Sequence, residues 1–132
     1  MSRREMREHI FRLIFRMDFH PEDEMNEQEE LYLDNLVGIT DEERQYIQTK
    51  ADAVRGMKDE LDQQIDAVAD KWKTSRMTKV DLTALRLACY EIKYDDAVSA
   101  ATAINEAVEL AKNYGTDNSG SFVNGILAKV VK

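Results

Sequence analysis

Apolar residues recur along the chain with the period of an amphipathic helix. In the first segment, one stripe of apolar residues comprises Met6, Ile10, Leu13, Ile14 and Met17. Their spacing places them on one face of a helix, because an α-helix makes a turn about every 3.6 residues. The stripe ends before Pro21, the only proline of the chain. No segment alternates apolar and polar residues between turn signals, so the pattern predicts an all-helical protein without a sheet.

Capping residues divide this pattern into seven predicted helices that form one compact bundle. The helices are expected over residues 6–17, 26–37, 41–55, 59–72, 78–94, 100–114 and 119–130. Thr40 and Glu43 have the spacing of a capping box, in which each side chain satisfies a free backbone amide. Thr78 with Asp81 is expected to cap the fifth helix in a related way.

Two finer expectations concern the fourth and sixth helices. In the fourth, Leu61, Ile65, Val68 and Trp72 repeat at helical spacing, so all four are expected to face the core. In the sixth, Gly115 follows the last periodic residue and is expected to end the helix in the left-handed conformation.

Length and composition favour a single globular domain over residues 1–132. The chain is 43% hydrophobic and 33% charged, which suits a buried core beneath exposed helix faces. No apolar run is long enough to cross a membrane, and the charged first segment lacks the pattern of a signal peptide. The one cysteine, Cys89, permits no disulfide within the chain. We therefore expect a cytoplasmic protein.

Charge is distributed unevenly along the chain, whose formal net charge is −8. Residues 1–20 carry five basic and three acidic residues, residues 21–70 four and sixteen, and residues 71–132 nine and seven. A local basic face matters more for nucleic-acid binding than the overall charge does, so the two basic ends permit RNA binding. The arginines near the N-terminus either bind phosphate or pair with Glu5 and Glu8.

Residue types suited to catalysis are not arranged for it. The histidines His9 and His20 have no carboxylate or cysteine at metal-ligand spacing, and Cys89 lies within an apolar helix face. Glu106 and Glu109 are better explained as an exposed acidic face than as an acid–base pair. The sequence therefore predicts a binding protein, not an enzyme, with no metal and no cofactor.

The segment 112–122 combines a base, aromatic rings, glycines and hydroxyls around the turn between the last two helices. Single-stranded RNA is bound by such groups, because bases stack on aromatic rings and phosphates accept hydrogen bonds at helix N-termini. Composition alone favours the plainer interpretation, a helix cap followed by a turn and a core phenylalanine.

Two longer motifs point to a family. The run A-I-N-E-A-V-E-L-A-K at 103–112 is followed by F-V-N-G at 122–125, and T-K-V-D-L-T-A-L-R-L-A-C-Y-E occupies 78–91. These segments resemble the characteristic helices of the NusB family over about 50 residues. The resemblance implies an all-helical antitermination factor of the bacterial cytoplasm. Such a factor binds single-stranded boxA-type RNA together with the small ribosomal protein NusE. It then joins the transcription elongation complex and promotes read-through of ribosomal RNA operons.

The resemblance also implies which residues bind. The RNA surface would comprise the N-terminal arginines and the turn before the last helix, namely Arg3, Arg4, Arg7, Lys112, Tyr114, Ser119, Ser121 and Phe122. The protein partner would dock on the side that includes Asp81.

The chain departs from the family pattern at two places. The loop 95–100 lacks the proline often found there, which implies a looser loop or a shifted helix start. Position 118, often acidic in the family, is Asn118, which removes a negative charge beside the expected RNA surface. Our hypothesis is that RNA binding depends less on the protein partner as a result.

Two alternatives stay open at this point. A similar fold serves as a regulatory or RNA-recognition domain in some RNA cytosine methyltransferases, which would require a longer chain than these 132 residues. A self-associating helical module, such as a homodimer, is the other alternative, because the sequence does not determine the oligomeric state.

Overall fold

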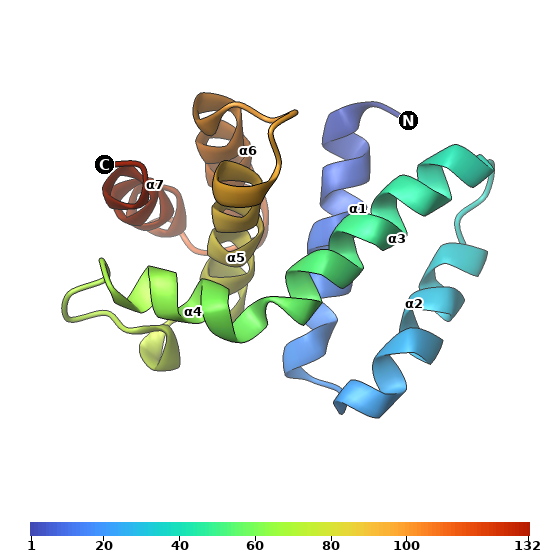
Figure 1. Ribbon diagram of the computed structural model, residues 1–132, viewed down its shortest axis with the longest axis horizontal. Helices are drawn as coiled ribbons and strands as arrows, with labels where there is room; N and C mark the ends of the chain where they lie inside the picture. The colour runs from blue at the N-terminus through green and yellow to red at the C-terminus, as the bar shows by residue number, and fades with distance from the viewer. The chain divides into compact units, whose positions relative to one another are not determined.

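The computed structural model describes residues 1–132 and contains seven α-helices and no strand, as predicted (Figure 1). The helices are α1 (Arg3–Phe15), α2 (Met25–Asp34), α3 (Asp41–Gly56), α4 (Lys58–Asp66), α5 (Lys79–Tyr94), α6 (Ala100–Tyr114) and α7 (Ser119–Val130). Three short 3-10 turns lie at Arg16–Asp18, Glu22–Glu24 and Thr74–Arg76. None of the helices is both long and apolar enough to traverse a lipid bilayer.

The helices form two compact units, Met1–Gly56 and Met57–Lys132. The first unit contains α1, α2 and α3, and the second contains α4, α5, α6 and α7. The single domain expected over residues 1–132 therefore stays a prediction.

In the first unit α1 packs against α3, and both helices begin with a capping box. Ser2 Oγ accepts a hydrogen bond from the Glu5 amide at 3.1 Å, and the Glu5 carboxylate accepts one from the Ser2 amide at 3.3 Å. The predicted box at α3 is confirmed, since Thr40 Oγ1 accepts from the Glu43 amide at 3.1 Å and Glu43 accepts from the Thr40 amide at 3.0 Å. Both boxes satisfy amides that would otherwise lack partners at a helix start.

A polar cluster in the same unit surrounds the guanidinium of Arg55 on α3. This group donates a hydrogen bond to Asn26 Oδ1 at 2.9 Å and lies 3.7 Å from the buried carboxylate of Glu29 on α2. Asp52 lies within 3.5 Å of the same guanidinium. Burial, followed by a hydrogen bond and repulsion from Asp52, raises the pKa of Glu29 to about 7.

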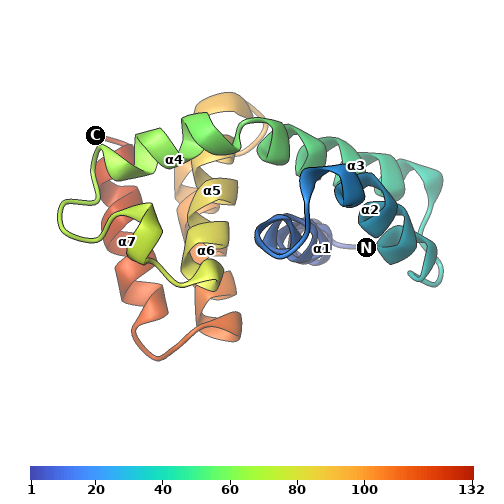
Figure 2. The ribbon, with the colours of Figure 1, turned by 90° about the horizontal axis from the view of Figure 1, so that it is seen from below.

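The second unit is built around α5, which contacts α4, α6 and α7. Helix α5 begins as predicted, because Thr78 Oγ1 accepts a hydrogen bond from the Asp81 amide at 3.2 Å. Nearly every residue from Asp81 to Cys89 is buried, since neighbouring helices cover α5 on several sides. In Figure 2, α4 crosses one end of α5 and α7.

Helix α4 ends at Asp66, well before the predicted end at residue 72. The Asp66 carboxylate accepts hydrogen bonds from the Thr74 amide at 2.7 Å and the Thr74 hydroxyl at 3.1 Å. These bonds fold residues 67–73 into a loop instead of a further helical turn. Trp72, expected to face the core, is consequently 54% exposed. That part of the prediction was wrong because periodicity does not detect a side chain that competes for the backbone.

Helix α6 has the predicted bounds, and Ser99 caps it by accepting a hydrogen bond from the Thr102 amide at 3.1 Å. The loop before it needs no proline, because Asp95 Oδ1 accepts a hydrogen bond from the Ala97 amide at 3.1 Å. The prediction that Gly115 adopts the left-handed conformation was wrong, since its backbone is extended with φ −105° and ψ −154°. Glycine is needed there for space, because a Cβ atom would lie 2.3 Å from Ser119 Oγ.

Candidate nucleic-acid interface

The turn between α6 and α7 is held by the side chains of its own serines. Ser119 is buried, and its Oγ accepts a hydrogen bond from the Thr116 amide at 3.0 Å. Ser121 Oγ donates to the Asn118 carbonyl at 3.1 Å. Both predicted RNA-contacting hydroxyls are therefore engaged in shaping the start of α7. Neither could have been assigned this role from spacing alone, because the role depends on how the turn closes.

Lys112 and Phe122 flank this turn on α6 and α7. The Lys112 side chain is mostly exposed, and its ammonium group lies 4.0 Å from Glu109 on the same helix. Its carbon stem runs beside Gly120, where an added Cβ would come within 3.0 Å of Lys112 Cγ. The missing side chain at Gly120 thus allows the lysine to lie along the start of α7. Phe122 and Tyr114 are half-buried.

The predicted arginines belong to the first unit and occupy the opening turns of α1. Arg3 and Arg4 are exposed, whereas Arg7 is only 6% exposed. Arg12 pairs with Glu8 at 3.1 Å. Pairing with a nearby glutamate was the alternative to phosphate binding for the arginines of this helix. Glu5 is used instead in the cap of α1, where hydrogen bonds from Ser2 lower its pKa. Arg3 and Arg4 are therefore the arginines presented to solvent at this end of α1.

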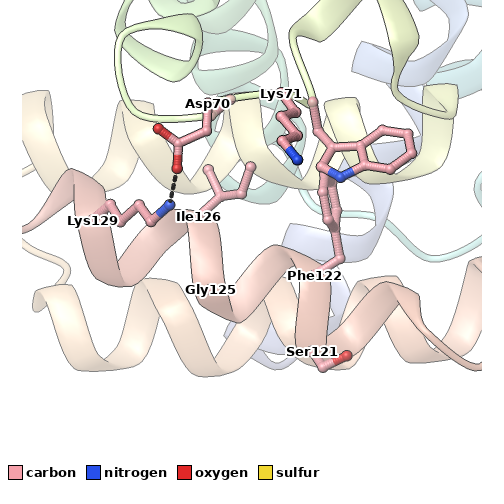
Figure 3. A pocket seen from close by; sticks show the side chains of 9 residues that line it. Asp70, Lys71, Ser121, Phe122, Gly125, Ile126 and Lys129 are labelled. Carbon is pink, nitrogen blue, oxygen red and sulfur yellow. Dashed lines mark hydrogen bonds and ion pairs between the residues drawn. The ribbon is translucent and has the colours of Figure 1, made fainter.

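Two pockets flank the aromatic side chains of the second unit, and sequence analysis found neither. The α7 pocket has a volume of about 420 Å³ and is lined by Ala69, Asp70, Lys71, Trp72, Ser121, Phe122, Gly125, Ile126 and Lys129 (Figure 3). The Asp81 pocket has a volume of about 300 Å³ and is lined by Trp72, Arg76, Met77, Thr78, Asp81, Thr116, Asn118, Ser119 and Phe122. Trp72 and Phe122 line both pockets. No local pattern could have found them, because each joins segments that lie about 35 to 60 residues apart in the sequence.

Asp81 is 8% exposed, and its Oδ1 atom has no hydrogen-bond partner. Buried polar atoms without a partner are rare in folded proteins, since losing water without replacement costs about 1–3 kcal/mol. Arg76, the basic residue of this pocket, lies with its guanidinium carbon 5.4 Å from the centre of the Trp72 ring. Asp81 therefore lines this pocket with a carboxylate whose Oδ1 atom is itself covered by the fold.

The remaining reactive side chains do not form a site. Cys89 is fully buried, and burial raises the pKa of its thiol to about 12, so the nucleophilic thiolate is not formed near neutral pH. His9 lies 2.6 Å from the Tyr32 hydroxyl through Nδ1, and burial lowers its pKa. Both side chains have structural roles.

The chain is similar to transcription antitermination proteins over its full length. The sequence model of the NusB family matches residues 4–132. The transcription antitermination proteins NusB of Agathobacter rectalis and Lachnoclostridium phytofermentans are 54% and 50% identical to it, over 98% and 99% of this chain and the same shares of theirs. The solved structure of T. maritima NusB superimposes with a TM-score of 0.87 at 30% identity, covering 98% of this chain and 90% of that one. A chain in a crystal structure of the antitermination factors NusB and NusE with double-stranded RNA shares the fold, with a TM-score of 0.77, 22% identity, and coverage of 97% and 94%. By these similarities, this chain belongs to the NusB family of transcription antitermination proteins.

Proposed function

We propose that this protein binds single-stranded boxA-type RNA together with the small ribosomal protein NusE in the bacterial cytoplasm. The complex would join the transcription elongation complex and promote read-through of ribosomal RNA operons. The observation that carries the RNA part is the α6–α7 turn, which places exposed Lys112 and half-buried Phe122 beside the N-terminus of a 12-residue helix. Cations, aromatic faces and helix N-termini are the groups that hold phosphates and unstacked bases.

Within this proposal the predicted RNA residues have different roles. Lys112, with Arg3 and Arg4, would contact phosphates, and Phe122 would contact a base. Ser119 and Ser121 would act through the shape of the turn, because their hydroxyls are already hydrogen-bonded within it. Arg7 is buried, so any contribution it makes to RNA affinity would be smaller, whereas Tyr114 is half-buried like Phe122.

Asp81 would contact the protein partner. Its side chain lines the Asp81 pocket, which a basic or hydroxyl side chain of NusE could enter to reach the carboxylate. A charge-assisted hydrogen bond in such a site is short and strong, because little water competes for the acceptor. The substitution Asp81→Asn should therefore weaken NusE binding while leaving RNA affinity in the absence of NusE unchanged. The matched control is Asp117→Asn, which removes an exposed carboxylate from the α6–α7 turn.

The proposal is tested by measuring affinity for a boxA-type RNA and a scrambled RNA across a salt series, with and without NusE. Counterion release predicts that affinity falls as salt rises, and Arg4→Ala should reduce that slope by about one. Arg12→Ala is the control, since this arginine lies on the same helix and pairs with Glu8. Equal affinity for the two RNAs in the presence of NusE would overturn the proposal.

The two alternatives make different predictions. This chain spans 98% of the Agathobacter rectalis relative, which favours an antitermination factor over a domain of a methyltransferase. Self-association, including a homodimer, stays a prediction that sedimentation velocity at several concentrations can test.

A further inference from the structure

The α7 pocket has the size and lining of a site for a small planar group. Its volume of about 420 Å³ lies within the range of about 300–1,000 Å³ typical of small-molecule sites. One wall is the loop that replaces the predicted end of α4, and the other is the face of α7 between Ser121 and Lys129. Ile126 and Phe122 give this second wall an apolar surface.

Trp72 presents an indole to this pocket without being buried by the fold. The side chain is 54% exposed, although tryptophan is among the most costly residues to leave in water. Arg76, at 5.4 Å from the ring centre, attracts the ring through a cation–π interaction. The indole therefore provides a surface on which another flat ring can stack.

The charges at the rim favour an anionic ligand. Asp70 adopts a left-handed backbone with φ 51°, and its carboxylate accepts a hydrogen bond from Lys129 at 2.7 Å. This pairing neutralises one of the two pocket lysines and leaves Lys71 without an ion pair. Figure 3 shows the Lys71 side chain pointing toward Ile126 and Phe122, over the apolar wall. An aromatic surface beside an unpaired cation suits a base with its phosphate.

We infer that the α7 pocket takes one nucleotide of single-stranded RNA, with the base stacked on Trp72 and the phosphate bound by Lys71. This inference rests on the proposed function and extends its RNA surface to the loop between α4 and α5. The extension is continuous, because Ser121 and Phe122 line the pocket and also belong to the proposed RNA surface. The neighbouring Asp81 pocket, with its buried carboxylate, is less suited to a phosphate.

Tryptophan fluorescence tests the inference directly, because Trp72 is the only tryptophan of the chain. Stacking against a base should quench its emission when boxA-type RNA is added, with and without NusE. The variant Trp72→Phe contains no tryptophan, so any tryptophan emission in its mixture with NusE comes from NusE and can be subtracted. Trp72→Ala should lower RNA affinity by roughly 5- to 150-fold, since stacking contributes about 1–3 kcal/mol per base. Because the side chain is half-exposed, we expect Trp72→Ala to fold, and circular dichroism spectra that match the wild type would verify this.

A series of RNAs with one abasic nucleotide each identifies the nucleotide that occupies the pocket. At one position, loss of the base should weaken binding to wild type and have no further effect on Trp72→Ala. Lys71→Gln supplies a second variant and should reduce the salt slope by about one. Lys73→Gln is its control, because the Lys73 ammonium is outside the pocket and donates to the Asp66 carbonyl at 2.8 Å.

The outcomes separate this inference from the proposed function. RNA binding with unchanged Trp72 emission and full affinity in Trp72→Ala would overturn the inference and leave the proposed function standing. Emission that responds to NusE alone would identify a protein-docking site and also overturn it. Failure of the wild-type protein to prefer boxA-type over scrambled RNA would overturn the proposed function itself.

Discussion

Arg86 of α5 and Asp62 of α4 form a two-bond salt bridge within the second unit. Nε of Arg86 donates to Oδ1 at 2.7 Å and Nη2 donates to Oδ2 at 2.8 Å. Arg86 is 2% exposed, so its charge depends on Asp62 for the solvation that water cannot provide. The pair thereby ties α4 to the central helix.

Removing one member of this pair should destabilise the protein strongly. We expect Asp62→Ala to lower the free energy of unfolding by about 3 kcal/mol, because it removes both hydrogen bonds of this salt bridge from a buried guanidinium. Urea denaturation followed by circular dichroism measures the change. The control is Lys129→Ala, which breaks the exposed Lys129–Asp70 pair and should cost less than about 1 kcal/mol. Equal losses for the two variants would contradict the prediction.

Gly115→Ala should destabilise the α6–α7 turn by about 1–3 kcal/mol. The new methyl group would lie 2.3 Å from Ser119 Oγ and 2.7 Å from the Ala111 carbonyl oxygen, so the turn must shift. Thermal unfolding of the variant measures the loss. Adding Ser119→Ala should recover part of it by removing the closest contact. In the control Gly125→Ala, the added methyl group meets no atom within 4 Å, and stability should not fall.

The raised pKa of Glu29 predicts a component of stability that decreases as pH rises. The folded protein keeps this proton up to about pH 7, whereas an unfolded glutamate loses it near its ordinary pKa of 4.5. The folded state therefore binds more protons between these values, and this contribution, on the order of 2 kcal/mol, is lost as pH rises through 7. His9 acts in the opposite direction, because burial lowers its pKa.

Comparing wild type with Glu29→Gln isolates this contribution. Glutamine keeps the shape of the side chain and carries no charge at any pH, so its advantage over the wild type should grow from pH 5 to pH 8. Unfolding free energies measured at both pH values test this. The control is Glu27→Gln, at an exposed position on the same helix. Parallel pH profiles for wild type and Glu29→Gln would show that this carboxyl does not retain its proton.

Asn118→Asp should change stability and RNA affinity in opposite directions. Asn118 is the N-cap residue of α7 and makes no side-chain cap hydrogen bond. An aspartate there should stabilise the helix by about 0.3–1 kcal/mol, because a negative charge is favourable at a helix N-terminus. The same charge would repel RNA phosphates at the α6–α7 turn, so RNA affinity without NusE should fall. Unchanged RNA affinity at fixed salt would refute our hypothesis about position 118.

Local sequence determined the helices of this protein and most of their ends. The bounds of α6 and the caps at Thr40 and Thr78 were predicted because they depend on residues three or four positions apart. The NusB family, too, was identified from short contiguous motifs in α5, α6 and α7. Such features are encoded within a few turns of chain.

Tertiary structure decided which side chains are available for binding. The bonds between Asp66 and Thr74 end α4 early and expose Trp72, and packing around α5 leaves Asp81 Oδ1 without a partner. Both pockets are lined by Trp72 and by Phe122, which lies fifty positions further along the chain. Helical periodicity reports interactions between near neighbours only, so local sequence specifies the helices, and their packing forms the two pockets.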